Sequence, residues 1–221
     1  MSFQTALFQT AKAQRLALVA ALLLWCCLLV LVRDYYTDAA SAAFLLWNLW
    51  LALVPLVVGA SLDFKSRFWL LPFSIWILFL PNAPYILTDL IHLRATGAVP
   101  LWYDLALLLS CAGAGLFFGY LSLLDVHEKI QNRFGKRIGW IVALGSQFAC
   151  GFGIYLGRFL RFNSWEVLTN PRGLFSKIAH LVLNHAAYPS ALGVTLIFGI
   201  GLCLGYLALR AASSSTVRAP I

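Results

Sequence analysis

Charged residues are scarce in this sequence of 221 residues. They make up 11% of the chain, whereas hydrophobic residues make up 62%, and the mean hydropathy is +0.85. A soluble domain is about a quarter charged and about half apolar. The shortage of charge therefore excludes an ordinary soluble domain and indicates an integral membrane protein.

Motifs that identify common enzymes and metal proteins are also missing. The sequence contains no phosphate-binding glycine loop, no G-x-S-x-G nucleophile elbow and no H-E-x-x-H helix. The five cysteines form no C-x-x-C pair, and all lie in apolar runs, so we interpret them as small packing residues. Asp89, His92, His180 and His185 have no recognisable ligand spacing, so any metal or cofactor is unknown from the sequence.

Long uncharged runs are what the sequence has in abundance. Six of them are close to the roughly 20 residues that a helix needs to cross about 30 Å of hydrocarbon. We therefore predict an all-α membrane bundle of six transmembrane helices, forming a single domain over residues 1–221. The predicted spans are about 16–32, 39–62, 68–88, 105–124, 138–157 and 186–209.

Lysine and arginine residues are distributed unevenly between the predicted loops. Ten of the 16 fall on the side that holds both termini, and six fall on the other side. Positive residues favour the cytoplasm, so we predict a cell (inner) membrane protein with both termini inside. The net charge of +8 is then explained by attraction to anionic membrane lipids, without a nucleic-acid partner.

The third run contains two helix breakers and an amide, in the string Pro81-Asn82-Ala83-Pro84. A helix from residue 68 to residue 80 rises about 20 Å, so the break is predicted to lie inside the membrane. Because proline has no N–H, the carbonyls of Ile77 and Leu80 lose their helical donors, and we expect Asn82 to donate to backbone freed there. Broken helices of this kind often line binding sites, although a plain proline kink is the alternative.

A polar stripe follows the break. On a helical piece that begins at Pro84, an arc of about 100° would hold Tyr85, Thr88, Asp89, His92 and Thr96. Polar groups are costly against lipid, so the stripe is expected to face protein or a water-filled cleft. In an enzyme, Asp89 and His92 would serve as the catalytic acid/base pair.

The end of the fifth run supplies charge of the opposite sign. Gln147, Gly151, Arg158 and Arg161 share one helical face, and the predicted topology places the two arginines on the same side of the membrane as Asp89. Two arginines would form a clamp for an anion. The candidate substrate-binding residues are Asn82, Tyr85, Asp104, Gln147, Arg158, Arg161, Asn163 and Trp165.

An internal ion-pair network is the alternative to this clamp. Arg158 and Arg161 would then only neutralise Asp89 and Asp104 inside the protein. The two hypotheses predict different consequences of removing one charge, and the sequence leaves both open.

Two further patterns concern packing. Residues 174–185 combine an apolar face with a polar one, which predicts a short amphipathic helix at the membrane surface. The Gly-x-x-x-Gly pairs at 115/119, 153/157 and 201/205 allow helices to approach closely. We interpret them as contacts among the last three spans of one chain, and oligomerisation through these faces is the alternative.

Four strings of the sequence together resemble a known family. They are Leu80-Pro81-Asn82-Ala83-Pro84-Tyr85, Thr88-Asp89-Leu90, Trp102-Tyr103-Asp104, and Gly157-Arg158-Phe159-Leu160-Arg161 with Asn163-Ser164-Trp165. The resemblance is to domain of unknown function 1361, a family of bacterial integral membrane proteins of about this length. It implies a polytopic membrane protein and brings no activity or catalytic residue with it.

Three functions remain open at this stage. The first is a membrane-embedded enzyme or binding site for an anionic or lipid-linked substrate, built on the polar cluster near the extracytoplasmic face. The second is a small transporter or ion-translocating protein that uses the break, although the sixth run carries no matching break. The third is an accessory or assembly protein whose polar cluster only holds the bundle together. We favour the first.

Overall fold

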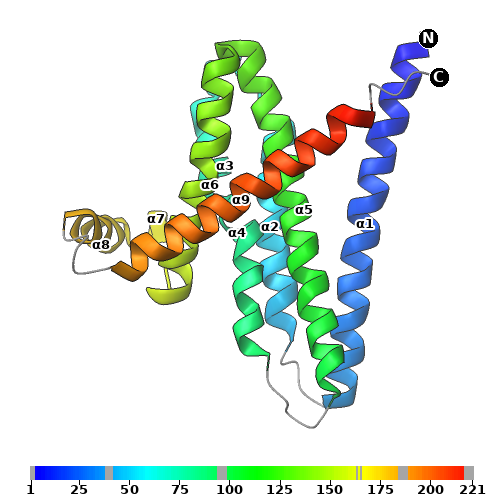
Figure 1. Ribbon diagram of the computed structural model, residues 1–221, viewed down its shortest axis with the longest axis vertical. Coiled ribbons are helices and arrows are strands. Elements are labelled where there is room, and N and C mark those ends of the chain that lie inside the picture. The colour runs from blue at the N-terminus through cyan, green and yellow to red at the C-terminus, as the bar shows by residue number, and fades with distance from the viewer. Residues whose placement is uncertain are drawn as a thin grey trace.

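The protein is built from helices, as its computed structural model shows (Figure 1). The structure describes residues 3–37, 42–93, 99–162, 164, 166–183 and 189–216, and these ranges contain no strand. Six helical segments are long and apolar enough to cross a membrane, which confirms the predicted class of fold. They are Lys12–Thr37, Ala43–Ser61, Leu70–His92, Leu101–Phe134, Lys136–Phe159 and Ser190–Ser213.

The order of elements follows the predicted spans. The helices are α1 (Phe3–Thr37), α2 (Ala43–Ser61), α3 (Leu70–Phe79), α4 (Asn82–Tyr85), the 3₁₀-helix η1 (Ile86–His92), α5 (Leu101–Phe134), α6 (Lys136–Phe159), α7 (Glu166–Thr169), α8 (Pro171–Leu183) and α9 (Pro189–Thr216). α8 is the predicted amphipathic helix, and it projects from one side of the bundle together with α7 (Figure 1). The start of α1 and the end of α9 lie at the same end of the molecule (Figure 1).

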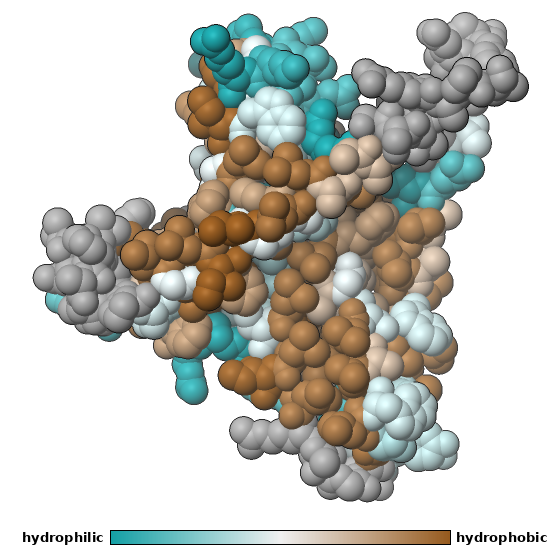
Figure 2. Space-filling model, in the orientation of Figure 1, coloured by the Kyte–Doolittle hydropathy of each residue, from teal (hydrophilic) through white to brown (hydrophobic). Residues whose placement is uncertain are grey.

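The surface has the distribution of polarity that a bilayer requires. Apolar residues cover the middle of the visible face, and hydrophilic residues gather mainly at the end where α5 joins α6 (Figure 2). Many large side chains point outward from the spans, among them Leu24, Trp50, Ile141 and Ile197, each at least 69% exposed. In a membrane these side chains contact lipid, so their exposure carries no cost.

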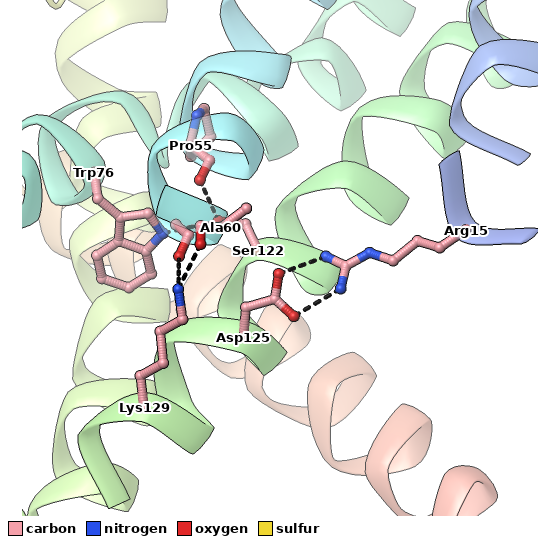
Figure 3. A network of polar contacts seen from close by, with 8 residues as sticks. Arg15, Pro55, Ala60, Trp76, Ser122, Asp125 and Lys129 are labelled. Carbon is pink, nitrogen blue, oxygen red and sulfur yellow. Dashed lines mark hydrogen bonds and ion pairs between the residues drawn. The ribbon is translucent and has the colours of Figure 1, made fainter. Parts of the chain in front are cut away.

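α5 is the most deeply buried of the six spans, and polar side chains on it hold its neighbours in place (Figure 3). Ser122 donates to the carbonyl of Pro55 in α2 (2.5 Å) and accepts from the indole N–H of Trp76 in α3 (2.8 Å). Asp125 receives two hydrogen bonds from Arg15 of α1, both 2.7 Å long. These contacts fix the packing of α1, α2 and α3 around α5.

The third span is interrupted where the prolines predict. α3 ends at Phe79, and the N–H of Ala83 donates to the carbonyl of Leu80, only three residues back (3.1 Å). The Phe79 carbonyl, which an α-helix would pair with Ala83, instead accepts from the Asn82 side chain (2.9 Å). The interruption and the role of Asn82 are therefore confirmed, but the carbonyl that Asn82 binds is that of Phe79 and not of Ile77 or Leu80.

The segment after the break differs from the α-helix that the sequence analysis assumed. Residues Ile86–His92 form a 3₁₀-helix, in which side chains three apart lie above one another. Asp89 and His92 therefore share one column, and Tyr85 and Thr88 share the next. The polar stripe is kept in the structure because these two columns of side chains lie next to each other. Thr96, the last predicted member of the stripe, lies outside the described residues.

Glycines on α5 and α6 make room for the break. A Cβ atom on Gly115 would lie 2.7 Å from the Ala83 carbonyl oxygen, and one on Gly153 would lie 2.6 Å from Cβ of Pro81. The first two Gly-x-x-x-Gly pairs thus contact the third span, where contacts among the last three spans were expected. Of the third pair, Gly205 lies against Tyr120 of α5, as expected, whereas Gly201 has open space. The close approach of α6 to α9 is made by Gly151, which lies against the Thr195 carbonyl, and by Gly199, which faces the Phe148 ring.

We predict that adding one methyl group affects stability differently at a closely packed glycine and at a glycine with open space. Gly115→Ala places a Cβ against backbone that cannot move freely, so the unfolding free energy should fall by about 1–3 kcal/mol. Gly113→Ala, two residues away and with nothing within 4 Å of the added atom, should be neutral or slightly stabilising. Thermal unfolding of both purified variants in detergent is the measurement, and equal melting temperatures would contradict the observed packing.

Candidate functional site

A cleft of about 490 Å³ lies between α2, the broken third span and α6. The third span forms one wall, α2 and α6 form the sides, and side chains from the segment after α6 also contribute. At one end the lining is polar, with Asn48, Asp89, His92 and Arg158. Further along the helices it is mostly apolar, with Leu51, Ile77, Leu78, Ala149, Phe152 and Leu156.

Arg158 is the centre of the polar end. Its Nη2 forms an ion pair with Oδ1 of Asp89, and its Nε and Nη2 both donate to Oγ1 of Thr88 (2.9 and 2.7 Å). Its Nη1 lies 3.0 Å from Nε2 of His92, and its guanidinium carbon lies 4.8 Å from the centre of the Tyr85 ring. One arginine therefore joins four residues of the predicted polar stripe.

Asp89 is held from two directions. Its side chain is 2% exposed, and its second oxygen accepts from Nδ2 of Asn48 in α2 (2.9 Å). A carboxylate this deeply buried is stable only when paired, and here the guanidinium of Arg158 supplies the pairing. The internal ion pair that the sequence analysis left open is thus present for Asp89 and Arg158.

The guanidinium also contacts His92. Arginine can only donate, so its Nη1 bonds Nε2 of His92 when that ring nitrogen carries no proton. Arg158 uses the N–H of Nε, both of Nη2 and one of Nη1 in these contacts, which leaves one Nη1 donor for a ligand. Because His92 is exposed, it is the titratable side chain at this end that a ligand reaches most easily.

Arg161 stands apart from this network. Its side chain is exposed, and no described carboxylate lies within ion-pair distance of it. Its φ of 59° is in the left-handed region, which is uncommon for a residue other than glycine. This conformation turns the chain back after α6, so that the N–H of Phe162 reaches the carbonyl of Leu156 (3.0 Å).

Three of the predicted substrate-binding residues do not line the cleft, and they are Arg161, Asp104 and Gln147. Asp104 pairs with Arg33 of α1 (2.6 Å) and not with Arg158 or Arg161, because α1 packs against the start of α5. Gln147 is 3% exposed and bonds to Ser146 (3.3 Å), on a part of α6 that faces away from the cleft.

The other predicted residues fall into two groups. Asn82 and Tyr85 line the cleft together with Asp89, His92 and Arg158. Asn163 and Trp165 lie outside the described residues, and so does His185 among the residues considered for a metal. Within the described ranges, no three His, Cys, Asp or Glu side chains are grouped so as to hold a metal ion.

Asn48 is the site residue that the sequence analysis did not find. It is an amide in the middle of a predicted span that is otherwise almost entirely apolar. A polar side chain in such a run needs a partner inside the protein. A single amide among apolar residues was therefore the sequence pattern that could have predicted a role for Asn48. Which helix would supply the partner depends on the packing of α2 against η1.

Comparison with known proteins gives the family. The model of the family described as "Protein of unknown function (DUF1361)" matches residues 47–204, which include α2 from Trp47 onward and most of α9. The chain belongs to the DUF1361 family. No curated protein and no solved structure matches it. The DUF1361 match covers every residue of the polar end described above.

We predict an asymmetry between the two halves of the ion pair. Arg158→Gln leaves a carboxylate with 2% exposure without its cation and should lower the unfolding free energy by about 3–5 kcal/mol. Asp89→Asn leaves the better solvated partner, 17% exposed, and should cost less. The double variant should recover part of the loss, because no buried charge is then unpaired.

Thermal unfolding of the two single variants and the double variant in detergent is the measurement. Arg161→Gln is the matched control, because Arg161 has no described carboxylate partner. Additive losses in the double variant would show that the pair is not coupled.

Proposed function

We propose that this DUF1361 protein binds a lipid or lipid-linked molecule in the cleft, with the polar group of the ligand beside Arg158 and His92. The observation that carries the proposal is the change of lining along the cleft. The polar end is formed by the residues nearest one end of α2, η1 and α6, and the apolar part extends along the same helices toward the middle of the membrane. A lipid of one leaflet has the same order of polarity along the same direction.

The length of the cleft supports this match. From Arg158 to Ala149, α6 rises about 13 Å at 1.5 Å per residue. One leaflet contributes about 15 Å of hydrocarbon, half of the thickness of about 30 Å. The cleft therefore accommodates the polar group and the first part of a chain from one leaflet, without reaching the other.

The accessible polar atoms favour a ligand rich in oxygen. Arg158 retains one N–H donor, and the exposed imidazole of His92 and the hydroxyl of Tyr85 can also donate. Asp89 balances the charge of Arg158, and the guanidinium remains able to donate to an anion. A phosphate group fits donors of this kind, because hydrogen bonds between arginine and phosphate are assisted by charge.

Binding is supported more directly than acid/base catalysis. The Nε2 lone pair of His92 faces Arg158, and Asp89 is buried and paired, so neither is free to take a proton from a ligand as they stand. A catalytic role for Asp89 and His92 requires Arg158 to change partners when the ligand binds. A purely structural role for the cluster is the second candidate, and the Asp89–Arg158 ion pair is the observation that favours it.

A cleft-filling substitution tests the binding proposal. Ala149 lines the apolar part and is exposed, so Ala149→Phe should fill the cleft without disturbing the core. Ile141→Phe is the matched control on the same helix, at a position that is 70% exposed and outside the cleft. We expect phosphatidylglycerol to raise the melting temperature of the wild type and of the control, and to leave Ala149→Phe unchanged.

Diacylglycerol with the same chains is the ligand control. It lacks the phosphate, so its effect on the melting temperature should be smaller. Equal stabilisation of all three proteins would show that lipid acts elsewhere, and no stabilisation of any would remove the proposal.

The membrane side of the site follows from the distribution of lysine and arginine. We propose that the cleft opens at the extracytoplasmic leaflet of the inner membrane and that both termini are cytoplasmic. Ser176 of α8 is exposed, and the proposed topology puts it outside the cell. In a variant without the five native cysteines, Ser176→Cys should react with an impermeant thiol reagent in intact cells. Labelling only after the cells are opened would reverse the orientation.

A further inference from the structure

The volume of the cleft limits the ligand that it can hold. At about 490 Å³ the cleft has room for about 16 groups of the size of a water molecule, which occupies about 30 Å³ in the liquid. A methylene group or an ester oxygen is of similar size. The phosphate, the glycerol carbons and the two ester groups of a diacyl phospholipid together have about 14 non-hydrogen atoms, so they would nearly fill the cleft before either chain begins.

The cleft is bounded by more than the three spans. Phe162 and Ser164, which follow α6, and Ile178 of α8 also line it. Ser164 is attached to the third span, because its hydroxyl accepts from the amide of Asn82 (3.0 Å). The volume is therefore limited on this side as well.

The lining of the cleft changes from polar to apolar within one helical turn. On α6, Leu156 is two residues before Arg158, and on α2, Leu51 is three residues after Asn48. A ligand with its phosphate beside Arg158 must therefore become apolar close to that phosphate. A chain bonded directly to the phosphate meets this condition, whereas a phospholipid has a glycerol and two esters in between.

The apolar part of the cleft also lacks donors for ester groups. Asn82 and Ser164 are the polar side chains that line it among the described residues. The two N–H groups of the Asn82 amide donate to the Phe79 carbonyl and to Ser164, and the Ser164 hydroxyl donates to the Leu78 carbonyl. An ester carbonyl in this part of the cleft would find both side chains already engaged, and a polar atom without a partner there is costly.

We propose that the cleft is specific for a single-chain lipid phosphate, in which one alkyl or prenyl chain is bonded directly to a terminal phosphate group. This inference rests on the proposed function, and it specifies the class of ligand. The phosphate accepts hydrogen bonds beside Arg158, and the first part of the chain lies along the apolar lining. A diacyl phospholipid also reaches Arg158, but its esters then occupy the apolar part, so it binds less tightly.

A lipid series on the full-length wild-type protein tests the proposal. The probes are dodecyl phosphate, lauroyl lysophosphatidic acid and dilauroyl phosphatidic acid, which share the chain length and the terminal phosphate. Each is titrated into delipidated protein in a neutral detergent while the melting temperature is followed. We expect an apparent Kd for dodecyl phosphate that is on the order of tenfold lower than for phosphatidic acid, as one ester carbonyl without a donor would give, with the lysolipid between them.

Farnesyl phosphate distinguishes the two sources of such a chain. Its main chain has the length of the dodecyl chain and carries methyl branches. Both compounds belong to the proposed class, so both should bind more tightly than phosphatidic acid. The tighter of the two identifies the preferred chain as prenyl or as alkyl.

A variant with a wider cleft tests whether size sets the preference. Phe152 lines the apolar part, so Phe152→Ala makes room there for the glycerol esters. It should reduce the preference for dodecyl phosphate over phosphatidic acid to less than about threefold. Phe159→Ala is the matched control on the same helix, at a position that is 56% exposed and outside the cleft, and it should keep the preference of the wild type.

The outcomes separate this inference from the proposed function. If the wild type binds phosphatidic acid as tightly as dodecyl phosphate, the inference is overturned and lipid binding remains. If none of these lipids raises the melting temperature, both are overturned. If Phe152→Ala keeps the full preference, the size of the cleft does not set it and the inference fails. If that variant does not fold, the wild-type series alone decides.

Discussion

A polar group inside the hydrocarbon of a bilayer has no water to bond to, so it must find its partner within the protein. This constraint governs how the six spans are assembled. Ser122 of α5, for example, bonds both the Pro55 carbonyl and the indole of Trp76, and farther along α5 Lys129 donates to the carbonyls of Gly59 and Ala60 at the end of α2 (2.8 and 2.6 Å). Ser122, Asp125 and Lys129 thus form a row of polar contacts along α5 (Figure 3). Each contact fixes both the position and the rotation of the helix that packs against α5 there.

The break in the third span is a second consequence of the same constraint. Two prolines remove the N–H donors that the carbonyls of Ile77 and Leu80 would have in an α-helix, and the hydrogen bonds around them are rearranged. The N–H of Ala83 bonds the Leu80 carbonyl, and the side chains of Asn82 and Ser164 bond the carbonyls of Phe79 and Leu78 (2.9 and 3.3 Å). Asn82 also donates to Ser164 (3.0 Å), which brings the chain after α6 against the break and forms part of the cleft. The cleft thus depends on how the broken backbone is satisfied.

The sequence predicts features that depend on one segment at a time. The six spans, the break and the amphipathic α8 follow from composition, proline and periodicity along the chain. The polar stripe also follows from periodicity, although the 3₁₀ geometry of η1 does not.

Features that depend on which helices become neighbours are not predicted. Asp104 and Arg33 are 71 residues apart, and nothing in the sequence says that α1 rather than α6 supplies the cation. Gln147 shares a helical face with Arg158 by periodicity, yet Arg158 lines the cleft and Gln147 does not. Asn48 has a partner in Asp89 only because α2 packs beside η1. In each case the deciding fact is the rotation of one helix against another.

The contrast between two polar clusters indicates where function resides. His127 is 1% exposed and is enclosed by Tyr206, Gln131 and Arg210, whose polar atoms lie 2.6, 2.7 and 3.0 Å from its ring nitrogens. That cluster joins α5 to α9 and does not line the cleft. The cluster around Arg158 is equally well paired, but it keeps an exposed histidine, one unused arginine donor and a cavity beside it. This difference in accessible space is the reason why we propose a ligand at the Arg158 cluster and interpret the His127 cluster as a contact between helices.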